Sequence, residues 1–366
     1  MEDISKKETT NKRIFYILLF FGTILVGFLL KSLSSVFLPV VLAVMLAFIL
    51  LPIIKKMTAK LHFPWIISSI VILVLFIITF LGLFSLLIRS LSTIIAEYPK
   101  YEKKFMSIYQ IIAKNFNLEF DESKSFIENV WKFLKVQEFV QNIAVFLSSG
   151  IVNFAKTFFT VCLLCVFLLI EMRTTKQKIY SAFDNDEAKV NKISHQIAND
   201  TVNYISIKFF ISLCTGILVF LATWILKMDF NIVWAFLAFI MNFIPIFGSI
   251  ISVGITTLFS ILQFYPNYGK PVFVLIYMIV VNFGLGNILE PRIEGKNLGL
   301  SPFVILVCLS LWGYIWGFLG MILAVPMTVI IKIICENSDY LKSIGILLGN
   351  GNDLNNNNST NKNNKT

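Results

Sequence analysis

Long apolar runs recur along this chain and decide what kind of protein it can be. A helix rises about 1.5 Å per residue, so about 20 apolar residues cross the ~30 Å hydrocarbon core of a bilayer. Six runs meet this requirement and predict membrane-spanning helices: residues 14–30, 33–51, 65–88, 150–170, 207–226 and 271–289. Only Lys31 and Ser32 separate the first two runs, which predicts that these two helices form an antiparallel pair.

Two further apolar stretches, residues 231–264 and 302–334, are too long for one crossing. As single helices each would be about 50 Å long. The first carries Pro245 and Gly248 near its centre. The second carries tryptophan–glycine pairs and a later proline: Trp312, Gly313, Trp316, Gly317 and Pro326. We expect each stretch to be a hairpin of two short arms, with a strongly tilted, proline-kinked single helix as the alternative.

The longest polar interval, residues 89–149, contains eight basic and seven acidic residues. Its apolar positions recur at helical spacing over 94–112 and again over 127–143, which predicts amphipathic helices on the outer side of the membrane. A shorter amphipathic helix is expected on the cytoplasmic side over residues 184–206. The Asn-rich segment 349–366 is of low complexity, and we expect it to be disordered.

Composition agrees with this pattern. Hydrophobic residues make up 57% of the chain, the mean hydropathy is +0.80, and only 14% of residues are charged, whereas soluble domains are about one quarter charged. The predicted fold is therefore all-α: a polytopic α-helical membrane protein with six full spans and two Gly/Pro-broken hairpins. Five parts are expected: a cytoplasmic N-terminus (1–13), three transmembrane helices (14–88), an extracytoplasmic amphipathic segment (89–149), a transmembrane transport core (150–348) and the disordered tail (349–366).

The net charge of +10 reflects membrane topology. Basic residues are scattered through short connections, as the positive-inside rule requires, without the basic surface that a nucleic-acid groove needs. Lys6, Lys7, Lys12 and Arg13 precede the first run, and no signal-peptide cleavage site follows it. We therefore expect a retained first helix with a cytoplasmic N-terminus, and counting the crossings makes the C-terminus cytoplasmic as well.

Charged residues are scarce around the last apolar segments. None occurs over residues 230–269 or 297–331. Between these stretches, Glu290 and Arg292 lie where the sixth run leaves the membrane. They are the first candidates for ion or substrate handling, because ionisable groups in spans usually face a bundle interior or an aqueous path. An interfacial Glu290–Arg292 ion pair that caps the helix is the alternative.

Amide side chains and the first break complete the candidate site. Asn242 stands three residues before Pro245, and a proline leaves an upstream carbonyl without its helical donor. Freed backbone groups inside a membrane must be covered or line a cavity, and interrupted spans often mark a transporter's binding site. The candidate path comprises Asn242, Pro245, Gly248, Asn282, Asn287, Glu290 and Arg292, with Asp200 and Glu171 as weaker coupling candidates.

Other chemistry lacks its motifs. There is no G-x-x-x-x-G-K-[ST] loop to hold ATP. The five cysteines lie in or beside apolar runs, and the two histidines, His62 and His195, lie in polar connections, so no cluster with metal-ligand spacing exists. Neither a Ser–His pair nor two aspartates occur within the apolar runs. We expect no enzyme activity, no cofactor and no metal site.

At these same residues the chain resembles the AI-2E (autoinducer-2 exporter-like) family of bacterial membrane proteins. The run from Glu290 to Pro302 is similar to the family's most characteristic loop, and the run from Trp312 to Pro326 is similar to its final hydrophobic motif. The segment 242–248 resembles its proline–glycine turn, although many members have proline where this chain has Ser249. The motif positions are Pro291, Gly295, Gly299, Pro302, Gly313, Gly317 and Pro326.

The resemblance covers about residues 10–340 and implies a permease of the bacterial inner membrane that forms a homo-oligomer. The family is linked both to export of a small furanone-type signal and to sodium or lithium/proton antiport. The leading hypothesis is secondary export of a small polar solute of the autoinducer-2 type, with a Na⁺(Li⁺)/H⁺ antiporter as the alternative. An oligomeric membrane scaffold without transport is a third hypothesis, from a different class. The expected partners are therefore the lipid bilayer and a small polar solute or a monovalent cation and proton, with no nucleic acid.

Overall fold

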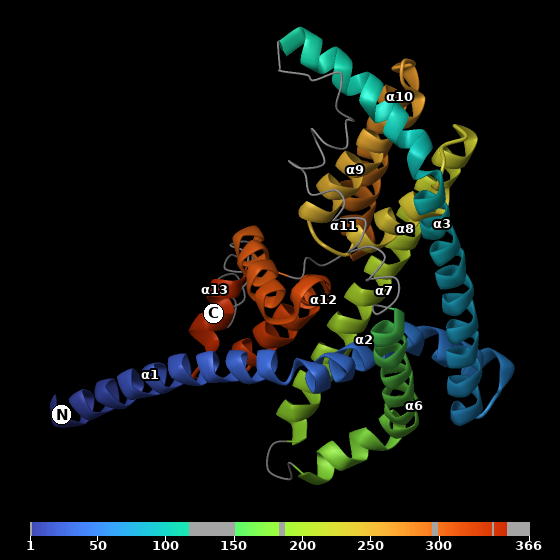
Figure 1. The fold of residues 1–366 in the computed structure, drawn as a ribbon. Coiled ribbons are helices and arrows are strands. Elements are labelled where there is room, and N and C mark those ends of the chain that lie inside the picture. Colours follow the sequence, from blue (N-terminus) through green and yellow to red (C-terminus); the bar gives the residue numbers. More distant parts are fainter. Residues whose placement is uncertain (1, 117–150, 183–186, 295–298, 339, 350–366) are drawn as a thin grey trace. The chain divides into compact units, whose positions relative to one another are not determined.

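A computed structural model describes residues 2–116, 151–182, 187–294, 299–338 and 340–349, and these are helical almost throughout (Figure 1). Within these ranges the sole β interaction is an antiparallel bridge between Leu300 and Gly349. The helices are α1 (Glu2–Ser32), α2 (Ser34–Leu61), α3 (Trp65–Phe116), α6 (Ile151–Ala182), α7 (Glu187–Ile225), α8 (Asn231–Met241), α9 (Phe247–Phe264), α10 (Gly269–Asn282), the π-helix η2 (Phe283–Leu289), α11 (Glu290–Glu294), α12 (Pro302–Glu336) and α13 (Lys342–Leu348).

Seven helices in the described part are long and apolar enough to cross a membrane. They are Ser34–Leu61, Trp65–Ile94, Asn153–Met172, Gln196–Ile225, Phe247–Phe264, Gly269–Ile293 and Pro302–Glu336. The apolar part of α1, Ile17–Ser32, is shorter. The predicted all-α, polytopic membrane fold is confirmed.

The chain divides into two compact units. Unit 1 comprises residues 1–46, 183–201 and 298–366, and unit 2 comprises residues 47–182 and 202–297. Helices α2 and α7 each contribute to both units.

The junction of α1 and α2, in unit 1, differs from the prediction. Leu33 donates its backbone N–H to Leu29 O at 2.9 Å, and Phe37 donates to Leu33 O at 3.0 Å. Helical hydrogen bonding thus continues through the junction, so the predicted antiparallel reversal at Lys31 and Ser32 is wrong. The physical reason is that this segment contains neither proline nor glycine and therefore nothing that ends a helix.

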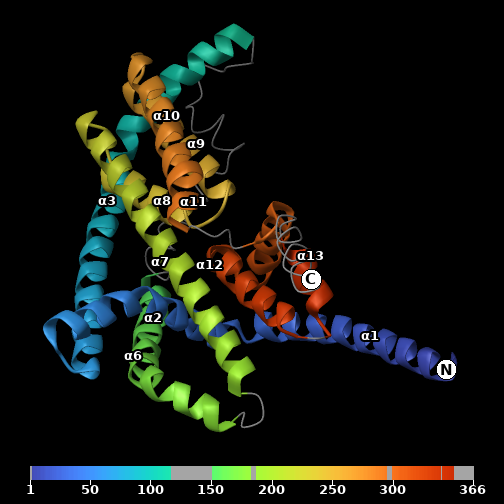
Figure 2. The same cartoon turned by 180° about the vertical axis from the view of Figure 1, so that it is seen from behind.

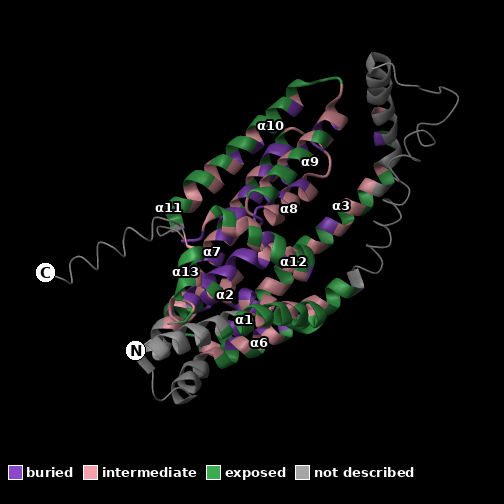
Figure 3. Ribbon diagram, turned by 90° about the vertical axis from the view of Figure 1, so that its left-hand side faces the viewer, coloured by how far each residue is buried: buried purple, intermediate pink, exposed green. Residues whose placement is uncertain are grey.

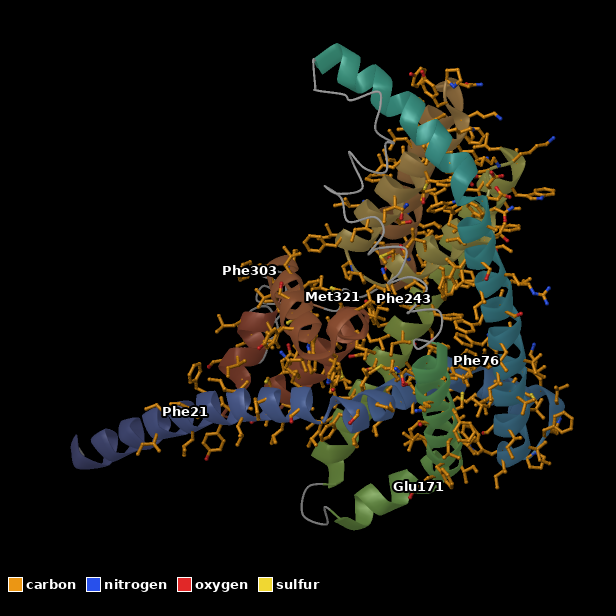
Figure 4. All side chains as sticks on the ribbon, viewed as in Figure 1. Phe21, Phe76, Glu171, Phe243, Phe303 and Met321 are labelled. Atoms are coloured by element: carbon orange, nitrogen blue, oxygen red, sulfur yellow. The ribbon has the colours of Figure 1, made fainter. Side chains whose placement is uncertain are left out.

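Helix α12, also in unit 1, is broken where the sequence predicts. Trp316 (φ −124°, ψ 16°) and Gly317 (φ 62°, ψ −142°) leave helical geometry, and Figures 1 and 2 show the helix folding back on itself. A Cβ atom on Gly320 would overlap the carbonyl oxygen of Trp312, and one on Gly313 would lie 3.0 Å from Cγ of Met321, labelled in Figure 4. The second hairpin is confirmed, and glycine permits its arms to meet.

The end of α1 holds the turn of this hairpin. The Trp316 indole donates Nε1–H to Leu30 O at 3.0 Å, and Nζ of Lys31 lies 3.4 Å from the centroid of the Tyr314 ring. An ammonium over an aromatic face is attracted by the negative charge of the ring surface. Both contacts come from the α1 C-terminus, so this helix end stabilises the α12 turn.

Phenylalanine rings join α3 to α6 in unit 2. Phe76, labelled in Figure 4, stacks on Phe80 at 5.9 Å between ring centroids, and Phe80 stacks on Phe158 at 4.5 Å. Phe84 stacks on Phe154 at 4.7 Å. Lipid supplies no hydrophobic driving force between helices, so stacking of this kind and close packing hold them together.

The first predicted hairpin is present as α8 and α9, which pack against each other in unit 2. Helix α8 ends at Met241 and α9 begins at Phe247. A Cβ atom on Gly248 would overlap the carbonyl oxygen of Met241. Only glycine therefore lets the first turn of α9 approach the last turn of α8 so closely.

Helix α9 has its polar side inward. Its exposed large side chains are apolar: Phe247, Ile250, Ile251, Ile255 and Leu258. Its buried residues are small or polar: Gly248, Ser252, Thr256, Ser260 and Gln263. We call the latter set the α9 polar face. This arrangement is the reverse of a soluble helix and fits lipid on the outside, and Figure 3 likewise shows exposed residues along α10 and α3.

The amphipathic helices of the prediction are continuations of spans. Residues 94–112 belong to α3, which runs unbroken from Trp65 to Phe116. Similarly, residues 187–206 belong to α7, which runs on to Ile225. The set over 127–143 and the tail 350–366 lie outside the described residues.

The C-terminal part of α3 is anchored to the loop between α7 and α8. Tyr101 donates its hydroxyl to Asp229 Oδ2, and Lys100 Nζ lies 2.9 Å from the same oxygen. Partial burial alone would raise the pKa of Asp229, but the hydrogen bonds from Tyr101 and Lys100 outweigh it and hold this pKa below its ordinary value. The same burial and hydrogen bond raise the pKa of Tyr101.

We predict that Gly320→Ala destabilises the protein by about 1–3 kcal/mol, because the new methyl group must push the two arms of α12 apart. Gly254→Ala is the matched control, since a Cβ there meets nothing within 4 Å and alanine favours helix. Thermal unfolding in detergent measures both. Equal midpoints for the two variants would contradict the close approach of the arms.

We predict that Asp229→Asn lowers the melting temperature at neutral pH, by an amount that shrinks as the pH falls. A carboxyl whose folded pKa is lowered contributes stability above its unfolded pKa of about 3.9, and this is lost as pH falls through the folded value. The measurement is the melting-temperature difference from wild type between about pH 7 and pH 3. Tyr101→Phe, which keeps the ring but removes the donor, should show a smaller difference with the same pH trend.

Candidate functional site

A charged pair is buried between α7 and α11 in unit 2. Lys208 Nζ lies 2.7 Å from Glu290 Oε1, and the two side chains are 9% and 13% exposed. Lys208 stands about halfway along the candidate span Gln196–Ile225. Removing water from two charges is costly, and the pair compensates only while both partners remain.

Glu290 directly follows the π-helix η2. This turn has wider hydrogen bonding than an α-helix, and such turns are frequent at functional sites. Its sequence contains Gly284 and Gly286, which weaken regular helix. A Cβ on Gly286 would lie 4.0 Å from Glu290 Oε2, so the carboxylate lies over a glycine.

Asn242, in the turn of the α8–α9 hairpin, contacts the side of α7 that carries Lys208. Its buried amide donates Nδ2–H to Ser212 Oγ at 3.0 Å. Ser212 stands one helical turn after Lys208, so both project from one side of α7. Lys208, Ser212, Asn242 and Glu290 therefore converge from three separate elements, and we call them the polar centre.

The hairpin turn presents Asn242 in a constrained backbone. Ile244 N–H donates to Met241 O at 2.9 Å, and Gly248 N–H donates to Ile244 O at 3.1 Å across Pro245. Ile246 has φ 65° and ψ −64°, a conformation that a β-branched residue adopts only under strain. The turn thus satisfies backbone groups that the proline would leave unpaired.

Helices α7 and α10 run in opposite directions beside the polar centre. The Tyr277 hydroxyl donates to Leu218 O at 3.1 Å, while ten residues earlier on α7 Lys208 meets Glu290. Later positions on α10–η2–α11 thus meet earlier positions on α7. These two ties fix where Glu290 stands along the span.

The predicted site residues separate into three groups. Asn242 and Glu290 contact neighbouring positions of α7, Ser212 and Lys208, with Pro245 and Gly248 shaping the turn that follows Asn242. Asn282 donates to Met278 O of its own helix at 2.8 Å. Of the other four, Asn287, Arg292 and Glu171 are exposed and Asp200 is half-buried.

The alternative of a Glu290–Arg292 ion pair is wrong. Among the described residues, Glu290 pairs with Lys208 across 82 positions of sequence, and no ion pair joins it to Arg292. Sequence reasoning missed Lys208. Its signal was available, because Lys208 is the one charged residue in the run 207–226.

The motif residues from Gly299 onward belong to unit 1, as does Asp200, whereas Pro291 belongs to unit 2. Buried Lys332 donates to Gly299 O at 2.9 Å and lies 3.4 Å from Glu336 Oε1. Ser301 N–H donates to Leu348 O at 3.2 Å, and Pro302 begins α12. The end of the 290–302 loop is thus fastened to α12 and α13, a structural role, while Gly295 lies outside the described residues.

Comparison with known proteins matches this chain to a family. The model of the AI-2E family transporter matches residues 14–339. Two relatives have names that propose transport without stating a solute. The one from Borreliella burgdorferi (strain B31) is 32% identical over 330 residues, covering 89% of this chain and 88% of the relative. The one from Haemophilus influenzae (strain Rd) is 30% identical over 328 residues, covering 88% and 92%.

A third relative has a named solute. The AI-2 transport protein TqsA of Escherichia coli (strain K12) is 27% identical over 327 residues, covering 88% of this chain and 91% of the relative. The family match extends over the broken hairpins, the polar centre and the 290–302 loop together. This chain therefore belongs to the AI-2E transporter family, and it is a multi-pass membrane protein whose relatives support a role in membrane transport.

Proposed function

We propose that this protein is a secondary transporter that exports a small polar solute of the autoinducer-2 type, with the polar centre as its binding site. The observation that carries the proposal is that Asn242, from an interrupted hairpin, bonds Ser212 one helical turn from the buried Lys208–Glu290 pair, inside the apolar helices of unit 2. Helix interruptions beside buried polar groups are typical of transporter binding sites. The name of the relative TqsA supports the solute class.

The polar centre favours a neutral, hydrogen-bonding solute. Lys208 and Glu290 neutralise each other, so the site has no net charge to attract an ion. The Asn242 amide and the Ser212 hydroxyl each provide donors and acceptors. A solute with hydroxyl or carbonyl groups can exchange its water for these groups at little cost.

A cation/proton antiporter is the second candidate, favoured by the same ion pair. A cation and a proton would then compete for the Glu290 carboxylate that Lys208 neutralises, which is the alternation that antiport requires. Such coupling needs Lys208 and Glu290 alone. Neutral-solute transport also needs Asn242, and this difference separates the two candidates.

We further propose that the protein resides in the bacterial inner membrane with both termini in the cytoplasm, and that it forms a homo-oligomer. Basic residues around the N-terminus and after α6 support this orientation. The exposed apolar faces of α3 and α10 offer surface to both lipid and a second copy.

We predict that Glu290→Gln abolishes transport in proteoliposomes and lowers stability by about 3–5 kcal/mol, because it leaves the Lys208 ammonium buried without a counter-charge. The double variant Lys208→Gln with Glu290→Gln should regain most of the stability but no transport. Arg292→Gln is the exposed control and should keep both. Transport by the double variant at the wild-type rate would limit the pair to a structural role.

We predict that Asn242→Ala lowers flux of a labelled hydroxylated furanone about tenfold, while Asn287→Ala leaves it unchanged. Parallel vesicles loaded for ²²Na⁺ uptake and for proton release test the antiporter. Sodium-driven proton release that survives Asn242→Ala would favour antiport over the proposed function. Absence of every flux from the wild-type protein would favour a scaffold.

A further inference from the structure

The α9 polar face contains hydroxyl groups that the described chain leaves unpaired. Ser252 is 2% exposed and Thr256 is 0% exposed. The hydroxyl oxygens of both have no hydrogen-bond partner among the described residues. A buried hydroxyl without a partner costs free energy, so its presence twice on one face requires a reason.

Three other hydroxyls in the same unit bond their own helix, while those of Ser206 and Thr257 also lack a partner among the described residues. Thr215 donates to Ile211 O at 2.9 Å, and Thr223 donates to Val219 O at 2.8 Å. Ser260, on α9 itself, donates to Thr257 O at 2.7 Å. Ser252 and Thr256 also lie on a helix, with a backbone carbonyl one turn before each, but neither hydroxyl bonds that carbonyl. Both hydroxyls can therefore still donate and accept a hydrogen bond with another group.

The α9 polar face leads away from the polar centre. It begins at Gly248, against Met241 and therefore next to Asn242. It ends at Gln263, whose side chain accepts from Asp229 N–H at 2.8 Å and donates to Lys227 O at 3.2 Å. The 15 steps between these ends correspond to about 22 Å of helix, most of the thickness of a hydrocarbon core.

We propose that Ser252 and Thr256 form a second solute subsite, on a path that runs along the α9 polar face from the polar centre toward the α7–α8 loop. The inference rests on the proposed transport function. The ligand is a small neutral solute with several hydroxyl groups, because a Ser or Thr hydroxyl both donates and accepts. An ion is disfavoured because residues 230–269 contain no charged side chain.

The first test measures flux of a labelled hydroxylated furanone into proteoliposomes. Thr256→Val replaces the hydroxyl by a methyl group of equal size, and Ser252→Ala removes the other hydroxyl. Each should lower flux at low solute concentration about five- to tenfold. The matched control is Thr223→Val, a buried threonine that bonds its own helix, and it should change flux less than about twofold.

Thermal stability separates this subsite from a packing seam, because Gly248, Ser252, Thr256 and Ser260 also have the four-residue spacing of close helix contacts. Thr256→Val should unfold at or above the wild-type temperature, since it removes an unpaired buried hydroxyl. Wild-type flux in both variants would overturn the proposal. So would a loss of flux that follows a loss of stability.

The second test does not depend on knowing the solute. The thiol of Thr256→Cys should react with a small, charged methanethiosulfonate reagent from water, whereas buried Cys165 and the thiol of Thr223→Cys should not. Glycerol or the furanone should slow the reaction at position 256. An unreactive thiol there, in protein that still transports, would overturn the path but leave the proposed function. A reactive, polyol-protected thiol in protein that moves no furanone would keep the path and overturn the furanone as solute.

Discussion

Hydrocarbon offers no hydrogen bonds, and this constraint governs every backbone group in the spans. The described chain answers it with helices almost throughout, so that each N–H and C=O is satisfied within its own segment. Breaks are then permitted only where something else supplies the bonds. In the α8–α9 turn, for example, the backbone bonds itself across Pro245.

The same constraint explains why polar side chains gather inside. Helix α9 exposes isoleucine and leucine and buries serine and threonine. Apolar side chains are stable against lipid, whereas hydroxyl groups need hydrogen-bond partners, which lipid tails lack. The Lys208–Glu290 pair is the extreme case, since neither charge could remain buried alone. Its geometry depends on α7 and α10 running antiparallel and on η2, which places Glu290 level with Lys208 along α7.

Much of the fold could be predicted because the signals are local. Length arithmetic and helix breakers identified both hairpins, and Pro245, Gly248 and Gly317 stand at their turns. The reversal predicted at Lys31 and Ser32 is wrong because no helix breaker stands there, and a lysine and a serine do not by themselves end a helix. Continuity of α3 and α7 beyond their spans was missed because a change from apolar to amphipathic pattern leaves helical hydrogen bonding intact.

By itself, the sequence determined that this is a helical membrane protein, where its apolar helices are interrupted, and that Glu290 and Asn242 are polar groups beside or within apolar segments. Those features depend on composition and on neighbours a few residues apart. Only the tertiary structure decided that Glu290 pairs with Lys208 instead of Arg292, and that Asn242 meets Ser212. The reason is that the packing of distant helices selects such partners, and no local pattern records which face of α7 will meet which turn.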